Sequence, residues 1–221
     1  MASRPISPLA DPVTVPYLEG EGVSIRPLRR ADLENCCRLY QEIGWDDPRL
    51  SKAEARTRRE AWLEWAIRND EQLAALHQPP YGDRVICDGD GAFAGLIGIV
   101  PRLEPFGRLP SQGGDPAAGL SAEVGLFWAL RPAWQGRGLA TAAAKLLSEW
   151  MFAVLGLRRI IAGTEYDNAA SIAVMRRLGM QIERNPSPEP PWFQISGSLT
   201  APQAVGLNTS APVPAAASAR L

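Results

Sequence analysis

The chain has 221 residues, which is enough for one domain with additional terminal segments but short for two complete domains. With 46% hydrophobic and 21% charged residues, the composition excludes a collagen-like, wholly disordered or membrane-embedded chain. Because 23 basic residues are balanced by 24 acidic ones, no overall positive charge exists to attract nucleic acid or an anionic membrane. We therefore expect no nucleic acid and no membrane among its partners.

The cysteine and histidine content predicts neither disulfides nor a metal site. Of the three cysteines, Cys36 and Cys37 are adjacent, which is not the spacing of a disulfide framework or of metal ligands, and His77 is the only histidine. Prolines interrupt the first residues where a secretory signal needs a continuous apolar stretch, and no run of about 18 apolar residues occurs. The sequence therefore predicts free thiols, no metal and a cytoplasmic location.

Two segments without periodicity enclose the patterned part of the chain. Residues 1–20 are rich in proline, and residues 200–221 consist mainly of Ala, Pro, Ser and Thr. Such segments bury too little apolar surface to fold, so we predict a mobile arm and a disordered tail. The predicted domain is residues 21–199.

The domain opens with a strand pattern over 23–28 and a helical pattern over 30–41. A second helix is predicted over 51–76, because Ser51 and Glu54 have the spacing of a capping box.

A hairpin and a long loop follow. Residues 84–87 and 92–100 have strand composition and flank Asp-Gly-Asp-Gly at 88–91, whose residues suit positive φ. Residues 101–120 are rich in proline and glycine and predict a long loop of the kind that often has a function.

The second half has the clearest pattern. After a strand over 122–130 and a glycine-rich turn, apolar residues recur at helical spacing from Leu139 to Val154. The remaining predicted elements are a strand over 159–164, a helix over 169–178, and strands over 180–184 and 192–199.

The turn before the long helix predicts a phosphate site. A helix N-terminus has unpaired backbone N–H groups and a partial positive charge, so it holds an anion that approaches closely. Gly136 and Gly138 lack the β-carbons that prevent this approach, and Arg137 adds a cation. A turn that only ends in a glycine cap is the alternative.

Two common nucleotide motifs do not fit this turn. A Walker loop needs Lys and then Ser or Thr after its last glycine, whereas Leu139 follows Gly138. A dinucleotide fingerprint needs a third glycine where Thr141 stands.

Two motifs in order resemble the GNAT superfamily of N-acetyltransferases, closest to the branch that includes ribosomal-protein alanine N-acetyltransferases. Residues 135–140 read Gln-x-x-Gly-x-Ala, which is similar to that family's acetyl-CoA pyrophosphate loop. Residues 168–180 resemble its Asn-x-x-Ser-helix-Leu-Gly-Phe segment, with Met180 in place of Phe. The resemblance covers about residues 20–199 and is strongest over 123–185.

The resemblance implies a single α/β domain with a mixed, mostly antiparallel sheet flanked by helices. It implies acetyl transfer from acetyl-CoA to a primary amine, by direct attack in a ternary complex and without a metal. The acceptor amine, either a protein N-terminus or a small molecule, is not identified, and both a monomer and a homodimer remain open. A CoA-binding sensor or interaction domain without catalysis is the alternative function, and a different acyl donor is a third.

The resemblance also assigns the cofactor contacts. The strand before the loop is expected to bond the pantetheine arm, and Asn168 and Ser171 to lie near the pantetheine and the sulfur. Asn168 caps the short helix in the alternative interpretation. The expected cofactor residues of the strand and loop are Trp128, Ala129, Leu130, Gln135, Gly136, Arg137, Gly138, Leu139 and Ala140.

Three residues are predicted to take part in catalysis. Glu123 opens the strand beside the cleft and is the candidate base acting through a water, although an exposed strand end is the alternative. Tyr166 is the candidate acid for the departing thiolate, or a packed aromatic residue. Ser171 is included because it is expected near the sulfur.

Overall fold

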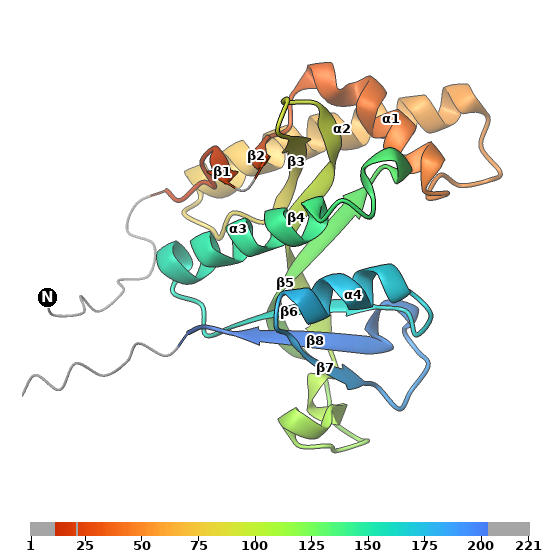
Figure 1. Ribbon diagram of the computed structural model, residues 1–221. Helices are drawn as coiled ribbons and strands as arrows, with labels where there is room; N and C mark the ends of the chain where they lie inside the picture. Colours follow the sequence, from red (N-terminus) through yellow and green to blue (C-terminus); the bar gives the residue numbers. More distant parts are fainter. Residues whose placement is uncertain (1–11, 21, 203–221) are drawn as a thin grey trace, which may run out of the picture.

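The computed structural model describes residues 12–20 and 22–202, and the described part forms one eight-stranded sheet with helices on both faces (Figure 1). The strands, in their order across the sheet, are β1 (Leu18–Gly20), β2 (Val23–Pro27), β3 (Gly82–Asp88), β4 (Phe93–Glu104), β5 (Ser121–Leu130), β6 (Arg159–Thr164), β8 (Ile195–Thr200) and β7 (Gln181–Arg184). The α-helices are α1 (Leu33–Glu42), α2 (Lys52–Ala75), α3 (Leu139–Leu155) and α4 (Ala169–Arg177).

The sheet opens between its two central strands. All neighbouring strands pair antiparallel except β5 and β6, which are parallel and share one register pair, Gly125 with Ile161. Beyond Gly125, β5 remains paired with β4 as far as Leu130, but its other edge has no partner strand among the described residues. This confirms the predicted mixed, mostly antiparallel sheet and leaves main-chain N–H and C=O groups of β5 open to a ligand.

Separate apolar clusters cover the two faces of the sheet. Helices α1 and α2 pack on one face against β3 and β4, with Leu39 and Leu63 buried in that cluster. Helix α3 packs on the other face against β2, β4 and β5, and α4 lies beside it against β6 and β7 (Figure 1). The sheet is therefore buried on both faces, and its central opening lies between the helix layers.

The predicted long loop begins later than expected. Residues 101–104 belong to β4, because they pair in register with β5 from Val124 back to Ser121. Pro101 is tolerated there since β3 has already ended and β4 is an edge strand on that side. After β4, two 3-10 turns bring Phe106 and Leu109 onto Ile161 and Phe193, so this loop is itself packed.

Two other boundaries differ from the sequence predictions. Residues 18–20 fall in the predicted arm, yet they form β1, because Leu18 pairs with Ile25 of β2. The last strand starts at Ile195 because Pro191–Phe193 is a 3-10 turn. Residues 1–11 of the predicted arm lie outside the described residues. The same is true of residues 203–221 of the predicted tail.

Candidate functional site

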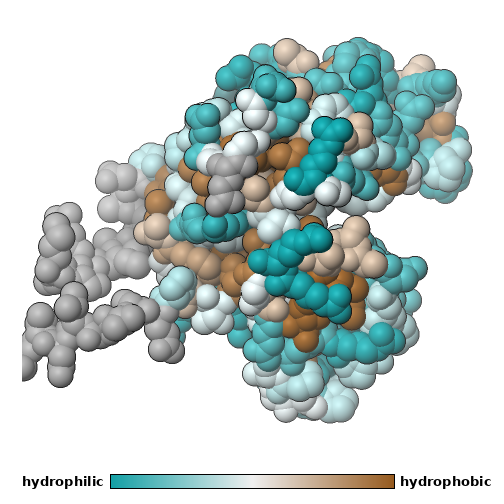
Figure 2. Space-filling model, in the orientation of Figure 1, coloured by the Kyte–Doolittle hydropathy of each residue, from teal (hydrophilic) through white to brown (hydrophobic). Residues whose placement is uncertain are grey.

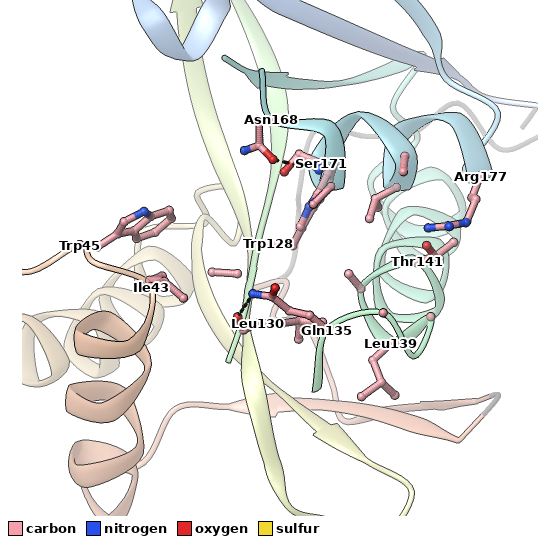
Figure 3. Close-up of a pocket in the computed structure, with 17 residues that line it drawn as sticks. Ile43, Trp45, Trp128, Leu130, Gln135, Leu139, Thr141, Asn168, Ser171 and Arg177 are labelled. Carbon is pink, nitrogen blue, oxygen red and sulfur yellow. Dashed lines mark hydrogen bonds between the residues drawn. The ribbon is translucent and has the colours of Figure 1, made fainter. Parts of the chain in front are cut away.

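A pocket of about 370 Å³ lies where the sheet opens. Its walls come from the end of β5, the turn before α3 with the first turn of that helix, one face of α4 and the loop after α1 (Figure 3). The space-filling view shows the surface hollowed between the part that carries α1 and α2 and the part that carries α4 (Figure 2). Elements far apart in the sequence therefore build one site.

The end of β5 provides the floor of this pocket. Trp128, Ala129 and Leu130 all line it, in the part of β5 that has no partner strand on the β6 side. A chain with amide groups can bond to such an edge as an added strand does. The predicted pantetheine contacts are thus placed together at the opening.

The turn before α3 presents free main-chain donors. No hydrogen bond within the described residues is donated by the backbone N–H groups from Gly136 to Thr141. Gly136 and Gly138 have φ of +72° and +82°, a region that side chains other than glycine rarely adopt. The N–H row and the helix dipole together form a site for an anion.

Side chains hold this turn in place. Gln135 donates from Nε2 to the Leu130 carbonyl at 2.8 Å, which ties the turn to the end of β5. Just before it, Arg131 binds Glu42 through two hydrogen bonds of 2.8 and 2.9 Å, and these bonds lower the pKa of the Glu42 carboxyl. Arg137 is exposed and does not line the pocket. The main chain, rather than Arg137, therefore faces the pocket.

Asn168 and Ser171 lie on the opposite wall from the turn. The Asn168 side-chain oxygen accepts a hydrogen bond of 3.1 Å from the Ser171 backbone N–H and so caps α4. Both residues also line the pocket, as Figure 3 shows. The capping alternative and the pocket position are thus both correct for Asn168.

A carboxylate adjoins this wall. Glu165 accepts hydrogen bonds from the Thr164 hydroxyl at 2.9 Å and from the Asn168 amide at 3.5 Å. Burial of the Glu165 carboxyl raises its pKa. The hydrogen bonds that it accepts from its own backbone N–H, from Thr164 and from Asn168 have a larger combined effect, so the pKa lies below its usual value. Glu165 is therefore ionised at neutral pH.

Glu123 lies away from this pocket. Its carboxylate is ion-paired with Arg159 and lines a different hollow. The Arg102 side chain crosses Gly125, where a β-carbon would come within 2.5 Å of it, and reaches Gly163. Arg102 thus separates Glu123 from the opening, which argues against Glu123 as a base at this pocket.

Tyr166 is also directed elsewhere. Its hydroxyl donates to the Asn185 carbonyl at 2.6 Å, and its ring stacks on Arg184, whose guanidinium carbon is 3.6 Å from the ring centroid. Tyr166 does not line the pocket. These contacts favour the packed-aromatic interpretation over the general acid.

Sequence reasoning missed seven lining residues, which are Ile43, Trp45, Thr141, Ala170, Ala173, Val174 and Arg177. Trp45 is 53% exposed at the mouth and contacts the Phe127 ring, with 5.8 Å between centroids. It follows α1 in a segment without periodicity, so no pattern identified it. The Arg176-Arg177 pair was visible, but only the packing of α4 beside α3 brings Arg177 to the pocket.

The described residues hold no group of three or more His, Cys, Asp or Glu side chains arranged to bind a metal ion. In the same part of the chain, no helix is both long and apolar enough to span a membrane. Cys36, Cys37 and Cys87 are free thiols; Cys36 and Cys87 are buried, whereas Cys37 is only partly buried.

Comparison with known proteins identifies an acetyltransferase family. The sequence model of a family described as "Acetyltransferase (GNAT) domain" matches residues 23–181. A spermidine N(1)-acetyltransferase of Escherichia coli K12 is 39% identical over 165 residues, which cover 73% of this chain and 74% of that protein.

Solved structures share the fold at low identity. An acetyltransferase from Agrobacterium tumefaciens C58 superposes with a TM-score of 0.59 at 22% identity, covering 86% of this chain and 96% of that one. RimJ of Mycobacterium smegmatis, solved in complex with CoA-disulfide, gives a TM-score of 0.57 at 18% identity, covering 86% and 88%.

Proposed function

Because the chain belongs to the GNAT family and is an acyltransferase, we propose that it moves the acetyl group of acetyl-CoA to a primary amine by direct attack in a ternary complex. The observation that carries this proposal is a single pocket that combines the open edge of β5 with the free N–H row from Gly136 to Thr141. The first suits an amide-containing arm, and the second suits a diphosphate.

Each wall of the pocket has a distinct task in this proposal. The β5 edge orients the pantetheine arm, and a β5 backbone N–H stabilises the oxyanion that develops on the acetyl carbonyl. The amine nitrogen forms a bond to the carbonyl carbon as the carbon–sulfur bond breaks. The Ser171 hydroxyl, beside Asn168, donates a proton to the departing thiolate and is reprotonated by the proton that the attacking nitrogen loses as the amide forms.

The amine has to lose a proton before it attacks. For an α-amine with a pKa of about 8, deprotonation at neutral pH costs only about 1 kcal/mol, against roughly 4 to 5 kcal/mol for a lysine-like amine. A strong base is therefore unnecessary for an α-amine. The ionised Glu165 attracts the ammonium form toward the Asn168 wall.

The acceptor enters, in this proposal, from the side of Trp45. Two carboxylates near that mouth, Glu42 and Asp46, are already paired with Arg131 and Arg59. The mouth beside Trp45 therefore has little unpaired negative charge that could attract a polycationic acceptor. The similar spermidine N(1)-acetyltransferase nevertheless makes spermidine an acceptor to test beside peptides with a free N-terminus.

The test is release of CoA from acetyl-CoA in the presence of a panel of amines and peptides, with the acetylated product identified by mass spectrometry. We expect release above background with at least one acceptor. Binding of acetyl-CoA without any release would favour the sensor alternative, and absence of binding would remove both.

Ser171→Ala tests the acid role of Ser171 in this assay. The cap on α4 uses the Ser171 backbone N–H, so it survives the substitution. We expect kcat to fall about tenfold or more while the Kd for acetyl-CoA is unchanged. Ser121→Ala, at an exposed position outside the pocket, should leave both values unchanged. Equal kcat for the two variants would contradict the role given to Ser171.

A further inference from the structure

We propose that Trp192 is a specificity-determining residue for the acceptor, and that it selects primary amines that carry a long apolar group, such as a peptide whose first residue is Phe. This inference rests on the proposed function and names the class of its acceptor. It concerns a residue outside the pocket described above, in the 3-10 turn before β8.

Trp192 lies beside the point where β5 and β6 separate. Its carbonyl oxygen would be 2.5 Å from a β-carbon at Gly163, so its main chain runs directly over β6. Gly163 is two residues beyond Ile161, the β6 residue in the register pair with β5. Under the proposed function the thioester lies along the unpaired edge of β5 that follows this pair. Trp192 is therefore near the reacting end of the opening, not near the turn before α3.

Trp192 and Trp45 flank the start of the opening on one face of the sheet. Gly125 and Phe127 point to the same side of β5, and Phe127 packs in the cluster of α1 and α2 and contacts Trp45. A β-carbon at Gly125 would come within 2.5 Å of Arg102, which donates to the Trp192 carbonyl at 3.2 Å. Both tryptophans are therefore on the face that carries α1 and α2, opposite α3.

Two buried side chains of β4 hold Trp192 in place. Its indole N–H donates to Glu104 at 2.8 Å, and its carbonyl accepts from Arg102. The Arg102 and Glu104 side chains are 16% and 10% exposed, whereas Trp192 is 54% exposed. Because the indole N–H already has a partner, only the apolar ring is left for a ligand. The ring is thus a fixed apolar surface that remains open to solvent.

The charges around Trp192 are paired, which favours an apolar acceptor group over a charged one. Arg102 and Glu104 lie 3.5 Å apart as an ion pair, and Glu123 pairs with Arg159. An additional ammonium or carboxylate on the acceptor therefore finds no free counter-charge beside the ring. An apolar group gains free energy in proportion to the area that it buries there.

The strand spacing sets the length of this group. Residues on one face of a strand are about 6 to 7 Å apart, which is the distance from Phe127 back to Gly125, beside Trp192. An amine that attacks a thioester next to Phe127 has to extend by about this length to reach the ring. The side chain of an N-terminal Ala is too short, whereas that of an N-terminal Phe is long enough.

The test compares kcat/KM for two peptides that differ only in the first residue, Phe or Ala, with the wild type, Trp192→Ala and Trp65→Ala. We expect the wild type to prefer the Phe peptide at least about tenfold, mainly through a lower KM. Trp192→Ala should lose about 10- to 50-fold on the Phe peptide and less than about threefold on the Ala peptide, because only the longer side chain reaches the ring. Trp65→Ala removes a tryptophan of similar exposure, 59%, from α2 outside the pocket, and should match the wild type.

Trp192→Gln provides a second variant, which keeps a side-chain N–H donor for Glu104 but removes the ring. It should show the same selective loss, and a wild-type Kd for acetyl-CoA identifies the variants that are folded. Equal losses for both peptides would limit Trp192 to a structural role and overturn the proposal, as would a wild-type preference for the Ala peptide or for spermidine. If acetyl transfer occurs without the selective loss, only this inference fails. If the wild type transfers acetyl groups to no amine, the proposed function fails with it.

Discussion

Gly138→Asp is expected to weaken acetyl-CoA binding at least about a hundredfold, or about 2.7 kcal/mol. Gly138 has φ of +82°, a conformation that Asp adopts more readily than most residues, and a β-carbon there would contact nothing within 4 Å. The fold should therefore persist while a carboxylate enters the free N–H row. At about 4 Å and an effective dielectric of about 20, two like charges repel by roughly 4 kcal/mol. Calorimetric titration of the purified variant measures the loss.

Two variants separate charge from shape in this experiment. Gly138→Asn has the same size and the same tolerance of positive φ without the charge, so we expect a loss of about tenfold or less. Gly179→Asp introduces the charge at another glycine of positive φ, +76°, outside the pocket, and should leave affinity unchanged. Equal losses in the Asp and Asn variants at 138 would contradict charge repulsion, and wild-type affinity in Gly138→Asp would contradict a diphosphate at this turn.

Asp70→Ala is expected to lower the free energy of unfolding by about 3–5 kcal/mol, because it leaves a buried charge without its hydrogen-bonded partner. The Arg84 side chain is 2% exposed and donates to Asp70 at 2.6 Å. Burial lowers the pKa of Arg84, and the charges of Asp70 and Asp83 oppose this effect, although of these two only Asp70 forms a hydrogen bond with the guanidinium. The remaining acceptors, the carbonyls of Pro80 and Gly82, are neutral. Denaturant unfolding monitored by circular dichroism measures the change.

The matched control is an ion pair of the same length at the surface. Arg30 and Glu64 also lie 2.6 Å apart, but the Arg30 side chain is 73% exposed, so Glu64→Ala should lower the stability far less than Asp70→Ala. Adding Arg84→Met to Asp70→Ala should recover part of the stability, since an apolar side chain leaves no buried charge. Similar losses for Asp70→Ala and Glu64→Ala would show that burial is not the cause.

The turn before α3 could be predicted because its determinants are local. Residues 135–140 follow a strand and precede an amphipathic helix, so glycine chemistry and the helix N-terminus are both readable from adjacent residues. The predicted helix boundaries lie close to the observed ones for the same reason. Ser51 accepts from the Glu54 backbone N–H, and the capping box marks the start of α2 as predicted.

Residues placed by tertiary packing were not predictable from one sequence. Trp45 reaches the pocket because α1 packs on the sheet beside Phe127, and Arg177 reaches it because α4 lies beside α3. Neither position has a local signal that differs from an ordinary loop or a solvated helix end. Spacing alone also gave Glu123 a place beside the cleft, since it could not show that Arg102 crosses Gly125.

Strand boundaries depended on pairing more than on composition. Residues 101–104 have the proline content of a loop, but register with β5 makes them strand. Leu18 lies in a proline-rich segment, yet pairing with Ile25 gives it a strand conformation. Such long-range pairs override local preference.

The most direct test of the account is the change in backbone amide NMR signals when acetyl-CoA is added to the isotope-labelled, full-length protein. The account predicts the largest changes at Gly136 to Thr141, where unpaired N–H groups gain phosphate oxygens, and further changes at Trp128 to Leu130. Saturating changes confined to other surfaces, such as the hollow beside Glu123, or no change at all, would contradict it.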